Sequence, residues 1–363
     1  MKSNFCTPSW PYNTIYRKHI EGNIGVKNMD HMLVSSWFHL HSSVPLSYVQ
    51  PPESRPGMVV VTSGKTIPVV DLGLHDRAET LSHILRASED YGFFQVINHG
   101  VSKELIDDTL NIFKEFHAMP PEEKMKESSR DPNESCRLYT SREINNKDCI
   151  QFWRDTLRHF CPPSGESMEF WPQKPAKYRE VVKKYTQELR RLGMKILEVL
   201  CEGLGLQKEY CSGGLSESPL LLAHHYPPCP EPDLTLGTPK HRDPNLLTIL
   251  LQQKDINALQ VFKDGEWIAV EPIPYAFVVN IGLLLQIISN GRLIGAEHRV
   301  VTNSGTARTT VAYFIRPRNE EIIEPAKPLT SSGVSPIYRS ITFEEFLKIF
   351  MGNGPDIEPQ LLL

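Results

Sequence analysis

Two histidines and one aspartate are the residues of this chain whose types and spacing best fit a metal centre. His241 and Asp243 are separated by a single residue, and His298 lies farther along the chain at the start of an apolar run. Two imidazoles and one carboxylate can hold a non-haem Fe(II) on one face of its octahedron, which leaves the other face open for a co-substrate and O₂. The same three ligands also suit a hydrolytic zinc ion. Ligand identity alone therefore leaves both metals open.

A second group of residues is suited to binding a carboxylate. Arg308 and Thr310 are alternate residues of a β-rich run, so we expect their side chains to share one face of a strand. A guanidinium binds a carboxylate through two parallel hydrogen bonds, and a hydroxyl adds another donor. Tyr226, just before Pro-Pro-Cys-Pro, is a further candidate donor. An α-keto acid that chelates a metal needs such an anchor at its distal carboxylate, so these residues favour an oxygen-activating iron centre.

The elements that must position these residues are mostly short strands. β-rich runs span 220–226, 246–252, 258–262, 267–270, 276–281 and 309–315, and His298 begins another. Turn sequences such as Asp264-Gly265 and Ser289-Asn-Gly291 separate them. Short strands at this spacing predict a double-sheet jelly roll or barrel.

Helical periodicity dominates the rest of the chain. Apolar residues at three- and four-residue steps predict helices over 78–91, 102–116, 175–203 and 341–351. Strands are expected over 65–72 and 92–98, and a long polar loop over 126–150. We divide the chain into a partly disordered extension (1–64), a mixed α/β N-terminal region (65–175), a jelly-roll domain with its backbone helix (176–330), and a C-terminal helix and tail (331–363).

Composition narrows the class of protein. The chain has 363 residues, 40% hydrophobic and 23% charged, with a net charge of -4, so nothing marks it for nucleic acid or an anionic membrane. Seven cysteines without close pairs argue against a disulfide framework and favour a reducing, cytoplasmic compartment. Residues 1–31 lack the apolar core of a secretory signal. We expect a monomer that acts on a small molecule, with no nucleic-acid or membrane partner.

The sequence closely resembles the plant Fe(II)- and 2-oxoglutarate-dependent dioxygenases over about residues 65–350. The matching motifs are Gly92-Phe-Phe-Gln-Val-Ile-Asn-His-Gly100, His225-Tyr-Pro-Pro-Cys-Pro230, His241-Arg-Asp243, Asn280-Ile-Gly282, Ser289-Asn-Gly291, His298-Arg-Val300 and Arg308-Thr-Thr310. Within the family, stretches such as Trp267-Ile-Ala-Val-Glu-Pro-Ile-Pro274 are most similar to the hyoscyamine 6-hydroxylase type. The resemblance implies a double-stranded β-helix, a cupin-like jelly roll flanked by α-helices, and so a mixed α/β, mainly β fold.

The resemblance also implies an activity and a site. His241, Asp243 and His298 would be the iron ligands, and the 2-oxoglutarate contacts would be Arg308, Thr310 and Tyr226. Fe(II), 2-oxoglutarate and O₂ would be required, with ascorbate as reductant. The implied reaction is oxidation, chiefly hydroxylation, of a small specialised metabolite such as an alkaloid, terpenoid or phenolic, with release of succinate and CO₂.

Three positions depart from the family pattern. Thr310 stands where a serine is usual, His224 stands where an asparagine is common, and Arg242 occupies the centre of a motif that usually holds a small or neutral residue. We expect the Arg242 side chain to point away from the metal.

Two alternatives stay open: an iron oxidase that does not use 2-oxoglutarate, similar to the aminocyclopropane-carboxylate oxidases, and a non-catalytic binding protein. Candidate pocket residues are Phe152, Phe262, Phe314 and Phe346.

Overall fold

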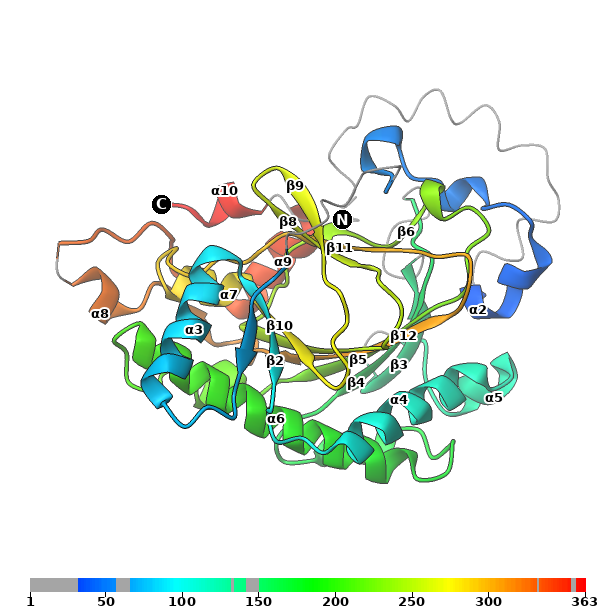
Figure 1. Ribbon diagram of the computed structural model, residues 1–363, viewed down its shortest axis with the longest axis horizontal. Coiled ribbons are helices and arrows are strands. Elements are labelled where there is room, and N and C mark those ends of the chain that lie inside the picture. Colours follow the sequence, from blue (N-terminus) through cyan, green and yellow to red (C-terminus); the bar gives the residue numbers. More distant parts are fainter. Residues whose placement is uncertain (1–31, 57–65, 132–133, 142–149, 332, 354–356) are drawn as a thin grey trace, which may run out of the picture.

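Two β-sheets face each other in the computed structural model, and helices cover the outer face of the larger sheet (Figure 1). The structure describes residues 32–56, 66–131, 134–141, 150–331, 333–353 and 357–363. The larger sheet has the strand order β1-β2-β10-β7-β12-β5-β4-β3, and the smaller sheet has the order β6-β11-β8-β9. This arrangement is the predicted jelly roll with flanking helices.

The bounds of the strands place the site residues at strand ends. The larger sheet consists of β1 (Val69–Asp71), β2 (Phe93–Ile97), β3 (Cys136–Thr140), β4 (Asp155–Phe160), β5 (Leu220–Tyr226), β7 (Leu247–Gln252), β10 (Phe277–Ile281) and β12 (Arg308–Ile315). The smaller sheet consists of β6 (Leu236–His241), β8 (Leu259–Lys263), β9 (Glu266–Ala269) and β11 (His298–Val301). A separate pair is formed by β13 (Ile322–Ile323) and β14 (Ile341–Thr342).

Three long helices pack along the outer face of the larger sheet: α3 (Arg77–Asp90), α4 (Lys103–Ala118) and α6 (Tyr178–Gly203). Helix α6 buries an apolar stripe that includes Tyr185, Leu189 and Ile196 against β7 and β12. Gly193 lies in this stripe, and a Cβ there would come within 2.3 Å of the Ile315 Cδ1 atom. The missing side chain therefore lets the helix approach the sheet closely. The predicted helices at 78–91, 102–116 and 175–203 are confirmed.

Side chains alternate along the strands β4 and β5. Leu157 and His159 on β4 are fully buried on the helix side, where the Tyr178 hydroxyl lies 2.8 Å from His159 Nε2. Arg158 and Phe160, on the opposite face, keep partial exposure. This opposite face, here called the interior face, looks toward the smaller sheet.

One element prediction was wrong, and four strands outside that segment were missed. The expected loop at 126–150 contains β3, which pairs with β4 in the register Leu138↔Leu157; residues 132–133 and 142–149 lie outside the described part. Strands β4 and β6 and the two-residue strands β13 and β14 were not anticipated. Strands β3, β4 and β6 carry polar residues at interior positions, so their apolar pattern is weak, and pairing with neighbouring strands fixes them instead.

Smaller elements complete the chain. They are α2 (Val34–Trp37), α5 (Pro121–Lys126), α7 (Leu283–Ile288), α8 (Lys327–Thr330), α9 (Phe343–Asn353) and α10 (Glu358–Leu361), together with short 3₁₀ turns. The α2 segment packs on the domain, because Trp37 contacts Trp153 edge to face, and the Val34 amide donates to Asp155 Oδ1 at 2.7 Å. Within the described residues, no helix is both long and apolar enough to cross a bilayer.

Candidate metal and co-substrate site

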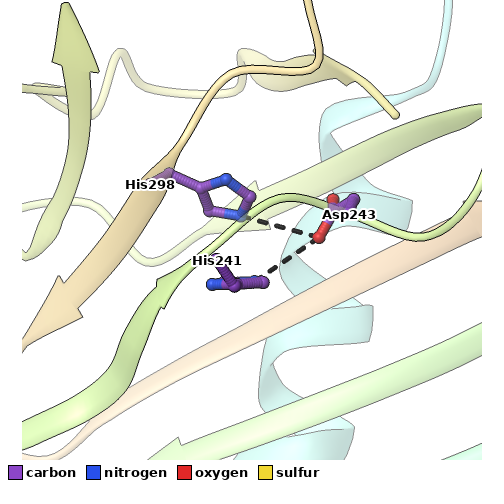
Figure 2. A group of neighbouring side chains, drawn as sticks. All are labelled: His241, Asp243 and His298. Carbon is purple, nitrogen blue, oxygen red and sulfur yellow. Dashed lines mark ion pairs between the residues drawn. The ribbon is translucent and has the colours of Figure 1, made fainter. Parts of the chain in front are cut away.

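His241, Asp243 and His298 converge at one end of the smaller sheet (Figure 2). His241 ends β6 and His298 begins β11, and the two are register partners. One potential ligand atom from each residue lies within 4.8 Å of the others. Asp243 lies outside the strand, two residues after the end of β6. The pairing of β6 with β11 and the path of the chain after His241 bring the three side chains together.

Backbone carbonyls fix the tautomer of both histidines. His241 Nδ1 lies 2.9 Å from the Pro239 carbonyl oxygen, and His298 Nδ1 lies 3.1 Å from that of Ala296. A carbonyl oxygen can only accept, so each Nδ1 carries the hydrogen and donates it. Each Nε2 therefore presents its lone pair toward Asp243, whose Oδ1 atom lies 3.4 Å from His241 Nε2 and 3.6 Å from His298 Nε2. This tautomer is the one that a metal-binding imidazole needs.

The other Asp243 oxygen is held by neighbouring side chains. Asp243 Oδ2 accepts a hydrogen bond from the Thr248 hydroxyl at 2.5 Å and another from the Asn280 amide. The Asn245 amide donates to the Thr248 oxygen at 3.0 Å, which directs the Thr248 hydrogen toward the carboxylate. Oδ1 is thereby left facing the histidines.

The protonation states suit a divalent cation. Burial raises the pKa of Asp243, but His298, His241 and the Thr248 hydroxyl lower it by more, so the pKa lies below its usual range. Burial lowers the pKa of His298 to about 4, with a further contribution from His241. At neutral pH the carboxylate is ionised and His298 is neutral, as metal ligation requires.

Arg308 is a buried cation with no carboxylate within ion-pair distance among the described residues. It is 1% exposed and is the register partner of Tyr226 on β5, with its guanidinium 5.4 Å from the centre of that ring. Arg308 Nη2 donates to Gln252 Oε1 at 2.9 Å, whereas Nε and Nη1 have no partner among the described residues. Burying an unpaired charge is costly. The two unused donors therefore indicate a site built for an anion.

The remaining predicted anchors lie on the same interior face. Thr310 is on β12 two residues after Arg308, and its register partner on β5 is His224. His225 faces the other way and stacks on His117 of α4, with ring centres 4.8 Å apart. The structure therefore places Arg308, Tyr226 and Thr310 side by side, and it adds His224 to their neighbourhood.

Arg242 points away from the histidine pair, as expected, and binds the C-terminal segment. Its Nη1 donates to Glu358 Oε2 at 2.6 Å. Glu358 Oε1 also accepts from Gln286 Nε2 at 2.8 Å and from the Tyr338 hydroxyl at 3.2 Å. Helix α10 is thereby tied to the segment that carries two of the predicted metal ligands. No local pattern could have revealed this pairing, because 116 residues separate its partners.

Sequence reasoning assigned no role to several side chains around the site: Arg154, Thr238, Asn245, Thr248 and Asn280. The polar Thr248 and Asn245 next to a metal-ligand motif were the available signal. Of the candidate pocket residues, Phe346 lies in the core and stacks on Phe343 and Phe350, whereas Phe314 keeps partial exposure on the interior face of β12.

Two family models match the chain. Residues 217–317 match the 2OG-Fe(II) oxygenase superfamily, and residues 67–177 match the N-terminal region of the non-haem dioxygenases in morphine synthesis. The first match spans His241, Asp243, His298, Arg308 and Tyr226.

Known proteins are similar over nearly their whole length. Protein DOWNY MILDEW RESISTANCE 6 of Arabidopsis thaliana is 42% identical over 330 residues, which cover 90% of this chain and 96% of that protein. Hyoscyamine 6-dioxygenase of Hyoscyamus niger is 40% identical over 336 residues, with 90% and 96% covered. The crystal structure of JOX2 in complex with 2OG, Fe and JA superposes with a TM-score of 0.79 at 34% identity, covering 89% of this chain and 95% of that one.

Proposed function

Because the chain belongs to the 2OG-Fe(II) oxygenase family of plant dioxygenases, we propose that His241, Asp243 and His298 hold its Fe(II). Two imidazoles whose Nδ1 atoms face backbone carbonyls, which leaves each Nε2 toward Asp243, and one ionised carboxylate support this assignment. Bound Fe(II) supplies the activation of O₂, coupled to decarboxylation of 2-oxoglutarate to succinate and CO₂. Three protein ligands would leave coordination positions for 2-oxoglutarate and O₂.

We further propose that Arg308, Thr310 and Tyr226 anchor the distal carboxylate of 2-oxoglutarate. The observation that carries this proposal is the buried Arg308 guanidinium with two donors unused. A carboxylate bound beside the guanidinium would accept charge-assisted hydrogen bonds from it and neutralise the charge. The threonine hydroxyl stands in for the usual serine and keeps the donor.

The substrate is proposed to be a small specialised metabolite, oxidised at a C–H bond and chiefly hydroxylated. Leu222, Phe160 and Phe314 keep partial exposure on the interior face, away from the Arg308 end. Their apolar surface could hold a hydrophobic molecule beside the metal ligands. Their task is to position the reacting carbon and to exclude water.

Succinate formation under defined iron supply tests the proposal. The protein is loaded with Fe(II) without O₂, and 2-oxoglutarate and a metabolite panel are then added with air and ascorbate. Stoichiometric succinate and a hydroxylated product are expected. His241→Ala should abolish both, and Arg308→Met should raise the 2-oxoglutarate requirement by about 10- to 100-fold, from the loss of a charge-assisted bidentate pair. Full activity in His241→Ala would refute the metal assignment, and an oxidised product without succinate would refute the co-substrate.

We also propose a cytoplasmic monomer. Five cysteines within the described part of the chain are free and buried: 136, 161, 201, 211 and 229. Free thiols fit a reducing compartment. Light scattering after size exclusion tests the monomer, and a fluorescent fusion tests the compartment; a dimer or an organellar signal would contradict them.

A further inference from the structure

A second arginine lies beside the proposed co-substrate anchor. Arg154 directly precedes β4, on the interior face that also carries Thr156 and His224. Its Nη1 donates to the Thr238 hydroxyl oxygen at 2.5 Å, and that oxygen lies 3.3 Å from the Tyr226 hydroxyl. Thr238 belongs to β6 of the smaller sheet, so this chain of contacts bridges the two sheets.

The chemistry of the three groups sets the direction of the hydrogen bonds. A guanidinium can only donate, so Thr238 Oγ1 accepts from Arg154. No other hydrogen-bond partner of Thr238 Oγ1 is found in the described part of the chain, so its own hydrogen is satisfied by donating to the Tyr226 oxygen. The Tyr226 hydrogen is then free to donate outward. The series ends at the Tyr226 hydroxyl, and Tyr226 is the register partner of Arg308.

The charge at this end of the interior face also fits an anion. Among the described residues no carboxylate lies within ion-pair distance of Arg154, and its Nε is buried without a partner. The Arg154 and Arg308 guanidiniums thus both approach Tyr226, one through Thr238 and one over the ring. A cation at the head of a hydrogen-bond chain polarises each bond and strengthens the last donor.

Gly237 makes this arrangement possible. A Cβ at Gly237 would lie 2.5 Å from Tyr226 Cδ1, so only glycine lets the ring lie against β6. The ring position brings the hydroxyl to Thr238, the next residue of the strand. The sequence of β6 therefore provides both the space for Tyr226 and the contact that orients it.

We propose that Arg154 is a positioning residue for 2-oxoglutarate, acting through Thr238 to aim the Tyr226 hydroxyl at the distal carboxylate. This inference rests on the proposed function of Arg308 and Tyr226. Through the hydrogen bonds that join Arg154, Thr238 and Tyr226, the smaller sheet contributes to co-substrate binding as well as the larger one.

The test measures 2-oxoglutarate binding without turnover. Fe(II)-loaded full-length protein is titrated anaerobically with 2-oxoglutarate, both by calorimetry and by the absorbance band that forms when a 2-oxo acid chelates Fe(II). Thr238→Val keeps the shape and removes the hydroxyl, and Thr238→Ser restores it. We expect a Kd about 5- to 10-fold higher for Thr238→Val and for Arg154→Met, since each removes the orientation of one hydrogen bond, and a near wild-type Kd for Thr238→Ser.

A double-mutant comparison separates orientation from a merely structural effect. In a Tyr226→Phe background the series has no terminal donor, so adding Thr238→Val should not weaken binding further. The inference would be overturned if Thr238→Val raised the Kd for 2-oxoglutarate equally in the wild-type and Tyr226→Phe backgrounds. It would also be overturned if Thr238→Val and Arg154→Met bound 2-oxoglutarate like the wild type while Tyr226→Phe bound it weakly. If Arg308→Met and Tyr226→Phe both bound 2-oxoglutarate normally, the proposed anchor itself would be wrong. If Thr238→Val does not fold, the Kd of Arg154→Met for 2-oxoglutarate decides the matter, because Arg154 is partly exposed and its replacement disturbs the core less.

Discussion

Replacement of Thr248 by valine tests how the metal carboxylate is held. In the wild type, the Thr248 hydroxyl oxygen lies 2.5 Å from Asp243 Oδ2 and donates its hydrogen to it. Valine has nearly the shape of threonine but cannot donate. The Asn280 amide still donates to the same oxygen. The Asn245 amide loses its acceptor at 3.0 Å. The carboxylate keeps its charge but becomes freer to rotate Oδ1 away from the histidines.

The magnitude follows from the type of bond that is lost. A hydrogen bond to a charged group contributes about 1.5–3 kcal/mol, and the remaining Asn280 contact places this case near the lower end. A loss of about 1.4 kcal/mol weakens binding about 10-fold. Removing a group that supports a metal ligand typically costs about 10- to 100-fold in metal affinity. We therefore expect the Kd for Fe(II) to rise about 10-fold.

The assay is an anaerobic titration with Fe(II), repeated with Co(II) as a redox-stable probe. Thr248→Ser, which keeps the hydroxyl, is the matched control and should bind nearly as tightly as the wild type. Circular dichroism confirms that each variant is folded before the titration. An unchanged Kd for Thr248→Val, or equal weakening in the serine control, would refute the idea that this hydroxyl orients Asp243.

Three further predictions concern the surroundings of the site. The side chains of Arg242 and Glu358 are 23% and 35% exposed, so their ion pair should contribute modestly to stability. A double-mutant cycle with Arg242→Thr and Glu358→Gln, measured by urea unfolding, should give a coupling free energy of about 1 kcal/mol. Gly237→Ala should destabilise the fold by about 1–3 kcal/mol and weaken 2-oxoglutarate binding, because its Cβ would displace the Tyr226 ring. Burial lowers the pKa of His159 to about 3. In the unfolded chain this histidine takes up a proton below about pH 6.5, whereas in the folded protein it stays neutral, so the folded state loses stability as the pH falls. His159→Phe should therefore make the free energy of unfolding less sensitive to pH between 7.5 and 5.

Each of these has a result that would contradict it. Strictly additive effects would mean that the ion pair between Arg242 and Glu358 contributes nothing to stability. A Gly237→Ala protein with normal stability and normal 2-oxoglutarate binding would show that the ring does not need that space. An undiminished loss of stability toward pH 5 in His159→Phe would assign that loss to other groups.

The helices and the apolar strands were predictable because their information is local. The stripe along α6 repeats at helical spacing, and β5, β7, β10 and β12 are runs of β-formers between turn residues. The strands β3, β4 and β6 were not predicted, because they carry charged residues such as Arg137, Arg158 and Lys240. The contacts of the sheet, rather than an intrinsic preference, keep these segments extended.

For the site, the sequence by itself determined which chemical groups are present and in what order. The motif His241-Arg-Asp243, the later His298 and Arg308 with Thr310 carry that information, because ligand chemistry depends on residue type. Only the tertiary structure decided which nitrogen faces the metal, which Asp243 oxygen is free, and where Arg242 points. It also decided that Arg154 meets Thr238 across 84 residues of chain. Hydrogen bonds depend on positions to within a fraction of an ångström, and strand register, not local spacing, sets those positions for residues far apart in the sequence.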